Sequence, residues 1–319
     1  MISEYVSIAH PDRMADLLAA KIIDDIQSFD RGHAAIEVLW TAKTVVVSGE
    51  VKTTFRLTDD YLKSCVDFIL QETGYKGKKE FEKKGLIKTD FEVLNLINQQ
   101  SPDIALGTDN GGWNDQTIAY GGYDPSTEFG LQKDKDLARR VCDNLFKTAL
   151  VDEKLGTDIK VKVSDRNITV AIPVLDDDFQ NYKKTIKSIL EETFPGYSFT
   201  INGTGKYEKH GPIADTGLTG RKITVNSPSI ENKVGGGSMI KPAHASDLLL
   251  PLWAKHLAYV SGYSTGDIAL SSTIGKKHLD SNSLDFAIDT TRDEMIDYFD
   301  LYKPGVFYEM VKTNFIYVK

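Results

Sequence analysis

The chain is poor in cysteine and has no long apolar run. Its 319 residues include two cysteines, Cys65 and Cys142, and no CxxC pair. This scarcity argues against a disulfide scaffold or a cysteine zinc site, and it is typical of a reducing cytoplasm. No apolar stretch approaches the roughly 20 residues that a membrane-spanning helix needs, and the first residues lack the apolar core of a signal peptide. We therefore expect a cytoplasmic protein with no membrane partner.

Positive charge is also in short supply. The net charge is −8, from 38 basic and 46 acidic residues, whereas general nucleic-acid binders are usually basic. We expect no nucleic-acid partner. The composition, 41% hydrophobic and 26% charged, is otherwise ordinary for a globular chain long enough for two or three domains. A local cluster of basic residues in so acidic a chain needs a local reason, such as a phosphate ligand.

The apolar pattern predicts an α/β (α+β) fold made of three successive units. Helical periodicity predicts helices over residues 11–29, 59–73, 135–150, 178–194, 245–260 and 291–299. Runs of β-branched and aromatic residues predict strands over residues 35–40, 43–48, 91–97, 158–164, 167–174, 198–201 and 267–273. Each third mixes strands with helices, which suggests a structural repeat. We expect three similar domains over 1–104, 113–209 and 210–319, related by pseudo-threefold symmetry, with packed sheets, helices outside and strands exchanged between the thirds.

The segment Gly205–Lys222 is the most informative stretch. It is rich in glycine, lysine and arginine, and it carries Asp215. Glycines let a backbone approach a ligand closely, and the adjacent Arg221 and Lys222 suit phosphate oxygens. We interpret the segment as a phosphate-binding loop that leads into an apolar strand at Ile223. A solvated surface loop is the alternative.

Two other patterns are candidates for binding phosphate and metal. The sequence HPDR precedes the first predicted helix, whose N-terminus attracts anions. There His10 and Arg13 are candidates for phosphate and Asp12 for Mg²⁺, with an ordinary helix start as the alternative. The glycine run of GGGSMIK ends at Lys241, and Asp247 follows six residues later. This run suggests a second phosphate contact, although three glycines alone are a weak signal.

Several polar residues flank the predicted strands. Glu37 and Glu50 lie beside strongly apolar runs and are candidates for a cation or an amine, with exposed charges at a sheet edge as the alternative. The polar loop over 100–115 is typical of a lid or of a plain surface loop. Asp158 and Lys160 would share one face of a strand, where they form either part of a site or a salt bridge.

Taken in order, these motifs resemble the S-adenosylmethionine synthetase (methionine adenosyltransferase) family. The resemblance runs from Glu4 to about Phe315, nearly the whole chain. It rests on the matches at Glu4–Arg13, Glu37 with Gly49–Glu50, Gln100–Ile104, Thr157–Lys160 and Gly217–Lys222. The chain is therefore identified as a divergent, compact member of this family.

Two motifs depart from the family's pattern. Of the family's G-A-G-D-Q-G, only Asp115 and Gln116 are kept. The motif at the glycine run is one residue shorter than in the family, which puts Ala245 where the family has a second lysine. One phosphate-binding charge is thereby lost or moved to a neighbour such as His244.

The resemblance implies roles for individual residues. The tripolyphosphate would be bound by His10, Lys160, Arg221, Lys222 and Lys241. The rest of ATP would meet Asp158 at the ribose, Tyr207 against the adenine, Asp215 and Ile274. Methionine would face Glu50, Gln100, Asp115 and Asp215. Two Mg²⁺ ions per site would be held by Asp12 and Asp247, and K⁺ by Glu37.

The resemblance also implies a reaction and an assembly. In the family the sulfur of L-methionine attacks C5′ of ATP and displaces tripolyphosphate, which is hydrolysed to pyrophosphate and phosphate. A thioether sulfur has no proton to lose, so such a site needs in-line positioning and charge stabilisation rather than a general base. The expected assembly is a homodimer with sites between the subunits, or a tetramer. The alternative functions are a non-catalytic nucleotide-binding or regulatory homologue and a tripolyphosphatase without transfer.

Overall fold

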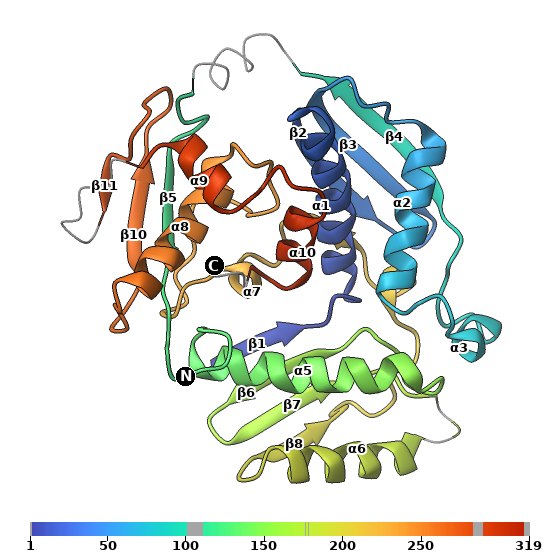
Figure 1. The fold of residues 1–319 in the computed structure, drawn as a ribbon. Helices are drawn as coiled ribbons and strands as arrows, with labels where there is room; N and C mark the ends of the chain where they lie inside the picture. Colours follow the sequence, from blue (N-terminus) through green and yellow to red (C-terminus); the bar gives the residue numbers. More distant parts are fainter. Residues whose placement is uncertain (1, 101–110, 176, 178, 283–289, 316–319) are drawn as a thin grey trace.

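Three small sheets with helices packed against them make up the fold (Figure 1). The computed structural model describes residues 2–100, 111–175, 177, 179–282 and 290–315. The mixed α/β architecture agrees with the prediction from the sequence. Within the described ranges, no helix is both long and apolar enough to cross a membrane.

The first sheet has the strand order β4-β3-β2-β9. Its strands are β2 His33–Trp40, β3 Thr44–Lys52, β4 Glu92–Gln99 and β9 Gly217–Leu218. Strands β3 and β4 are parallel, and the other neighbours are antiparallel. Side chains alternate between buried and more exposed along β2, as expected when only one face lies on the core. The helices that contact this sheet are α1 Pro11–Asp30 and α2 Asp59–Glu72, and the short α3 Lys79–Lys83 follows them.

The second sheet has the order β1-β6-β7-β8. Its strands are β1 Ile2–Val6, β6 Lys160–Ser164, β7 Asn167–Ala171 and β8 Ser198–Ile201, with α5 Lys133–Val151 and α6 Phe179–Thr193 packed on them. A tight turn joins β6 and β7, and Asp165 adopts φ 53° there. Asp tolerates this left-handed conformation better than most residues.

The third sheet has the order β11-β10-β5. Its strands are β5 Thr117–Gly121, β10 Ile268–Ser272 and β11 Ser281–Asn282. The remaining helical elements are η2 Gly211–Ile213, α7 Ile223–Asn226, α8 Ser246–Val260, α9 Arg292–Tyr298 and α10 Val306–Lys312. Helix α8 packs on β5 and β10 (Figure 1).

Strands from different thirds of the sequence share these sheets. Strand β1 pairs with β6, β9 pairs with β2, and β5 pairs with β10, although each pair is more than 140 residues apart in sequence. This pairing ties the thirds together. The boundaries 1–104, 113–209 and 210–319 and the pseudo-threefold relation of the units stay predictions.

The strand predicted at Ile223 is wrong. Residues Ile223–Asn226 form the single helical turn α7, with Asn226 N bonded to Lys222 O at 2.8 Å, and Val225 is buried. The strand of this segment lies earlier, in β9. A window of three or four residues cannot separate a strand from one helical turn, because both periods fit so short a run.

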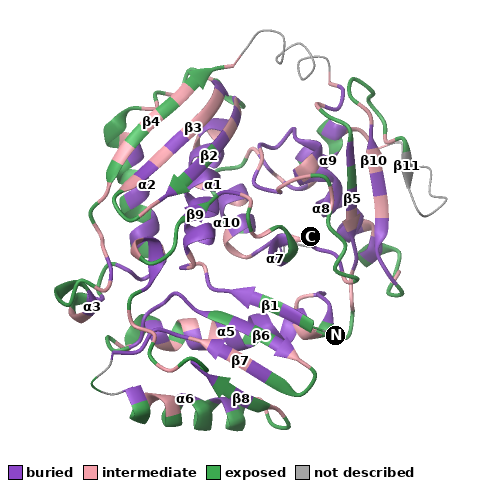
Figure 2. Ribbon diagram, turned by 180° about the vertical axis from the view of Figure 1, so that it is seen from behind, coloured by how far each residue is buried: buried purple, intermediate pink, exposed green. Residues whose placement is uncertain are grey.

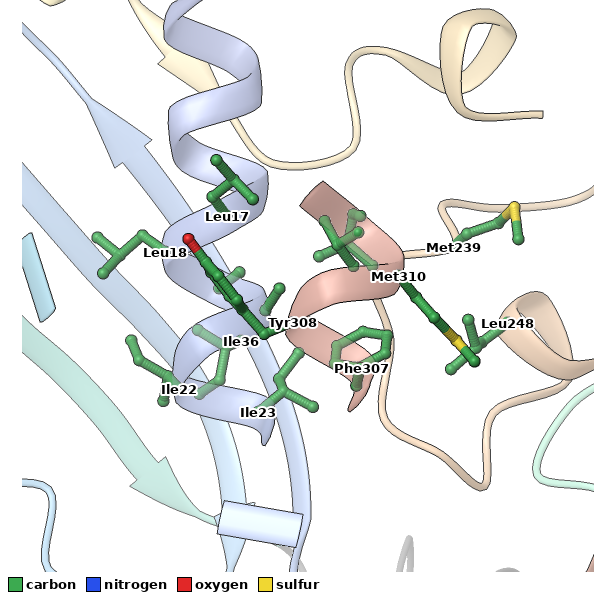
Figure 3. Packing of buried hydrophobic residues seen from close by; sticks show 14 of the residues in the cluster. Leu17, Leu18, Ile22, Ile23, Ile36, Met239, Leu248, Phe307, Tyr308 and Met310 are labelled. Atoms are coloured by element: carbon green, nitrogen blue, oxygen red, sulfur yellow. The ribbon is translucent and has the colours of Figure 1, made fainter. Parts of the chain in front are cut away.

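Helix α1 lies at the centre of the largest core. Its side chains Leu17 and Ile23 face β2 and α10, where Ile36, Phe307 and Tyr308 are also buried (Figure 3). Close packing on both sides restricts movement of a helix. The N-terminus of α1 is therefore held firmly against β9, and this end of the helix carries the first group of site residues.

Candidate functional site

The N-terminus of α1 brings Asp12 to the basic pair Arg221–Lys222. Asp12 is buried, and its carboxylate accepts hydrogen bonds from Leu218 N at 2.9 Å and from Lys222 Nζ at 2.5 Å. Arg221 Nη1 lies 3.4 Å from the same carboxylate. A predicted metal ligand and two predicted phosphate-binding cations thus meet at a helix N-terminus, where an anion is favoured.

His10 is the N-cap of α1 and stays neutral. Its Nδ1 accepts a hydrogen bond from Asp12 N at 3.2 Å. Burial, and then the charge of Lys222, lower the pKa of His10 to about 3. The ring can therefore offer its other N–H to a phosphate oxygen, but it supplies no positive charge at neutral pH.

Arg13, a candidate for phosphate in the sequence, is a structural residue. It is fully buried and donates to Asp16 at 3.3 Å, to Asn226 at 3.0 Å and to Val311 O at 2.6 Å. A guanidinium with these partners holds α1 to α7 and α10 and does not face the site.

Asp16 is a residue of the site region that the sequence reading missed. Its buried carboxylate accepts from Gly220 N at 2.8 Å and so fixes the turn before Arg221. The available signal was its spacing, since Asp16 lies four residues after Asp12 on the same helix, and residues four apart share a helix face.

Asp158 and Tyr207 form a second pair beside this group. The buried Asp158 carboxylate accepts from Gly211 N at 3.1 Å and from Tyr207 Oη at 3.2 Å. Burial, opposed by the hydrogen bonds from Gly211 and Tyr207, raises the pKa of Asp158 to about 6, and the charges of Asp215 and Lys222 have smaller, opposite effects on it. Asp158 therefore lies within electrostatic range of the charges of Asp215 and Lys222.

The prediction that Asp158 and Lys160 share a strand face is wrong. Strand β6 begins at Lys160, so the alternation of a strand does not reach back to Asp158. Asp158 is buried, whereas Lys160 is exposed and pairs with Glu4 at 3.1 Å. Lys160 still acts on the α1 end of the site, since its charge contributes to the lowered pKa of His10.

Asp247, in the first turn of α8, is the centre of a second group. Its carboxylate accepts from Thr117 Oγ1 at 3.0 Å. Burial raises the pKa of Asp247, with a further rise from Asp115 and an opposing effect of Lys241. A Cβ on Gly237 would lie 2.4 Å from this carboxylate, so the glycine run is needed for close approach of the backbone.

Contacts through β2 and through the segment after β9 link the two groups. Lys241 Nζ donates to Glu37 Oε1 at 2.7 Å, which ties the second group to β2. Strand β9 pairs with β2, and Gly220, two residues after β9, lies so close to Ser238 that a Cβ would be 3.0 Å from that side chain. Residues predicted for phosphate and metal therefore converge here from four distant parts of the sequence.

Glu50 and Gln100 lie at the end of β3 and β4. Through the strand register, Glu50 shares the outer face of the first sheet with Glu37. Gln100 N donates to Val51 O at 2.9 Å, and the buried Gln100 Oε1 has no hydrogen-bond partner among the described residues. The rest of the QSPDI motif and the predicted lid, over 101–110, lie outside the described residues.

Ile274 lies apart from the other predicted ATP-binding residues. It is 56% exposed and forms a bridge with Trp113, near Asp115. Among the described residues, no contact joins it to Asp158 or Tyr207. A single chain thus brings together the residues predicted for phosphate and for ribose, but it does not bring Ile274 to Tyr207, the other residue predicted for adenine.

His244 does not substitute for the missing lysine. It is buried with its ring 4.2 Å from that of His33, and burial lowers its pKa to about 3. Ala245 beside it is the N-cap of α8. The suggestion that the phosphate contact had moved to His244 is therefore wrong, because the ring is neutral and inaccessible.

The carboxylates suit a metal that shares its ligands with phosphate. Within the described ranges, no three His, Cys, Asp or Glu side chains form a cluster of their own. Mg²⁺ commonly binds through one or two carboxylates and completes its shell with substrate phosphates and water. Asp12, paired with Lys222, and Asp247, within electrostatic range of Lys241, fit that mode if these lysines bind phosphate as predicted.

Comparison with known proteins gives consistent results. The sequence model described as S-adenosylmethionine synthetase, N-terminal domain, matches residues 1–102. The S-adenosylmethionine synthase of Fusobacterium nucleatum is 32% identical over 261 residues, which is 74% of this chain and 65% of the relative. That of Acholeplasma laidlawii is 32% identical over 292 residues, or 80% of this chain and 72% of the relative. The chain thus spans about two thirds of the length of the curated relatives it matches.

A solved structure extends the similarity to the whole chain. The structure described as an unusual S-adenosylmethionine synthetase from Campylobacter jejuni superimposes with a TM-score of 0.86 at 25% identity. The alignment covers 100% of this chain and 94% of the other. From the sequence relationship and the shared fold together, the chain belongs to the S-adenosylmethionine synthase family.

Proposed function

We propose that this protein makes S-adenosylmethionine from ATP and L-methionine and releases tripolyphosphate, which it hydrolyses to pyrophosphate and phosphate. The observation that carries the proposal is the meeting of Asp12, Arg221 and Lys222 at the N-terminus of α1. Carboxylate and cations in contact with one another suit a ligand that is itself a metal cation bound to a polyphosphate anion.

The chemistry requires no general base. The methionine sulfur forms a bond to C5′ of ATP, the C5′–O bond breaks, and its electron pair leaves with the tripolyphosphate. Charge develops on the leaving group, so Lys222, Arg221 and Lys241 are placed to stabilise it. The neutral ring of His10 adds a hydrogen bond without extra charge.

The predicted metal ligands are paired with lysines in the structure. Lys222 is paired with Asp12, and Lys241 with Glu37. Asp12 and Asp247 would hold two Mg²⁺ ions per site, which would supply positive charge to the polyphosphate, and Glu37 would contribute to a K⁺ site. Lys222 and Lys241 bind phosphate oxygens in the complex with ATP.

The other proposed residues bind the nucleoside half of ATP and methionine. Asp158 binds the ribose, Tyr207 stacks on the adenine, and Asp215 lies near both, as its effect on the pKa of Asp158 indicates. Glu50, Gln100 and Asp115 complete the methionine site, with Asp215 as the partner of the amino group. Within one chain Ile274 lies apart from Tyr207, so Ile274 of the partner subunit lines the adenine pocket of a site between the subunits. Lys160 reaches the tripolyphosphate from β6.

A homodimer, or a tetramer built from it, is supported by the outer face of the first sheet. This face carries Leu39, Leu94, Leu96 and Leu218, all at least 36% exposed, together with Glu37. Figure 2 shows exposed segments along β4 of this sheet. Contiguous exposed apolar side chains of this kind commonly mark a protein interface. A second copy on this face would cover the leucines and bring its own residues to the same site.

The direct test is an assay with ATP, L-methionine, Mg²⁺ and K⁺, in which S-adenosylmethionine and phosphate are quantified by chromatography. We expect both products. A second reaction supplies tripolyphosphate without methionine. Phosphate release there, without any S-adenosylmethionine in the first reaction, would mean a tripolyphosphatase only. Nucleotide binding with neither product would mean a non-catalytic homologue.

A further inference from the structure

His210 lies inside the Gly205–Lys222 segment but has no role in the site described so far. The residue is 1% exposed. Its ring is stacked on Tyr75 at 5.6 Å between centroids and meets the edges of Phe81 at 5.0 Å and Tyr207 at 6.5 Å. A Cβ on Gly156 would lie 2.5 Å from the ring, so the backbone closes the remaining side. The imidazole thus fills a closed aromatic pocket.

The hydrogen bonds of the ring define its tautomer. Nδ1 lies 2.7 Å from Glu208 O, and because a carbonyl can only accept, Nδ1 carries the proton. Nε2 is buried and has no hydrogen-bond partner within the described part of the chain. The ring therefore makes one directed bond, which closes the turn from Glu208 to His210.

That turn carries both groups that hold Asp158. Tyr207 precedes the turn and donates to the Asp158 carboxylate, and Gly211 N follows it and donates to the same carboxylate. Tyr75, against the His210 ring, also donates to Ala9 O at 3.0 Å, next to His10. One imidazole is thus packed between the ribose candidate and the α1 end of the phosphate site.

We propose that His210 is a positioning residue that sets Tyr207 and Asp158 for the nucleoside half of ATP. It touches no substrate, and it acts through the Nδ1–H bond to Glu208 O and through ring packing. The proposal rests on the proposed function for the identity of the nucleotide. It predicts that loss of the Nδ1–H bond to Glu208 O weakens the contacts to the adenosine. The phosphate contacts at Lys222 should be spared, because Asp12 holds that lysine in place.

The test compares His210→Asn with His210→Gln and His210→Leu. An Asn amide can occupy the place of Nδ1 and keep the bond, whereas Gln places its amide further out and Leu has no donor. The dissociation constants of a non-hydrolysable ATP analogue and of inorganic tripolyphosphate, each with Mg²⁺, are measured by calorimetry. Loss of one buried hydrogen bond should weaken analogue binding about tenfold in the Leu and Gln variants. Tripolyphosphate binding should change less than about threefold, and Asn should restore most of the loss.

Three results would overturn the proposal. They are unchanged analogue binding in the folded Leu and Gln variants, an equal loss of analogue and tripolyphosphate binding, and failure of Asn to bind better than Gln. If Leu does not fold, the Asn–Gln comparison decides alone. These binding measurements need no turnover, so they can be made even if the wild-type protein forms no S-adenosylmethionine. That failure would contradict the proposed function, whereas the binding constants of the His210 variants would still test the positioning role.

Discussion

Lys222 is the residue at which the parts of the proposed site converge. It bonds Asp12 directly, and its charge affects the pKa of both His10 and Asp158. Removing it leaves the buried Asp12 without its closest cation, and the departing tripolyphosphate without one stabilising charge.

We expect Lys222→Ala to lower turnover about 100-fold or more, since single groups that stabilise developing charge commonly contribute this much. Lys222→Arg should retain more activity because it keeps the charge. The measurement is the initial rate of S-adenosylmethionine formation, with Lys184→Ala on the exposed face of α6 as the matched control. A Lys222→Ala protein with the wild-type rate would mean that the phosphate site lies elsewhere.

A second residue-scale prediction concerns Lys255 in α8. Lys255 is 1% exposed, and burial lowers its pKa to about 7, with a smaller effect of Arg139. In the unfolded chain a lysine has a pKa of about 10.4, so between pH 7 and 10 the unfolded state binds more protons. The free energy of unfolding should therefore rise with pH through this range, by up to about 1.4 kcal/mol per pH unit.

Urea denaturation of Lys255→Met and wild type at pH 7, 8 and 9 tests this expectation. In the variant, the free energy of unfolding should rise less steeply between pH 7 and 9. It should also be higher than that of wild type at pH 7. Lys135 is also buried with a pKa lowered to about 7, first by burial and then by the charge of Lys255. Removing Lys255 therefore also relieves Lys135, and the difference in slope between the two proteins reports both effects of the Lys255 charge. Equal slopes in the two proteins would contradict the prediction.

At the scale of elements, the short strand β9 depends on a glycine. A Cβ on Gly217 would lie 2.1 Å from Pro11 O, at the start of α1. The backbones of β9 and α1 must therefore separate if any side chain is present. Because Leu218 N and Lys222 both bond Asp12, this separation would disturb the phosphate site as well as the packing.

We expect Gly217→Ala to lower the free energy of unfolding by about 2 kcal/mol or more and to lower turnover. The matched control is Gly203→Ala, where a Cβ would meet only Thr200 Cγ2 at an ordinary 3.5 Å. Chemical denaturation and the synthesis assay give the two readouts. If both glycine variants behave alike, the close approach of β9 is not a requirement of the fold.

How far the elements could be predicted depends on their length. The helices α1 and α5 were predictable because an apolar residue pattern repeated over about five helical turns is still clear when single residues depart from it. β9 has two residues and α7 has four, so neither has a period to detect. β9 is held in place by β2 and α1, and α7 by a hydrogen bond from Arg13 of α1 to Asn226.

At the scale of the whole molecule, the outer face of the first sheet predicts self-association. Leu96 is 55% exposed there, in one row with Ser48 and Glu37 across β4, β3 and β2. A charge in the middle of a buried apolar interface is costly because it loses its water.

We expect Leu96→Asp to convert the wild-type dimer or tetramer to monomer and to reduce synthesis strongly, while the far-UV circular dichroism stays unchanged. Sedimentation equilibrium measures the assembly. Leu150→Asp is the control, since Leu150 is also exposed, at 45%, but lies on α5. A monomeric wild type with full activity, or a dimeric Leu96→Asp, would show that this face is not the interface.

The sequence by itself determined the family, the long helices and strands, and the residue types of the site. These features are local or are carried by short motifs such as GLTGRK, whose residue types indicate their chemistry without knowledge of the fold. Only the tertiary structure decided which residues meet. It buried Arg13 and His244, separated Lys160 from Asp158, and brought Asp16 to the turn before Arg221. The physical reason is that burial and contact depend on chain segments up to about 300 residues apart, such as α1 and α10, which no local pattern encodes.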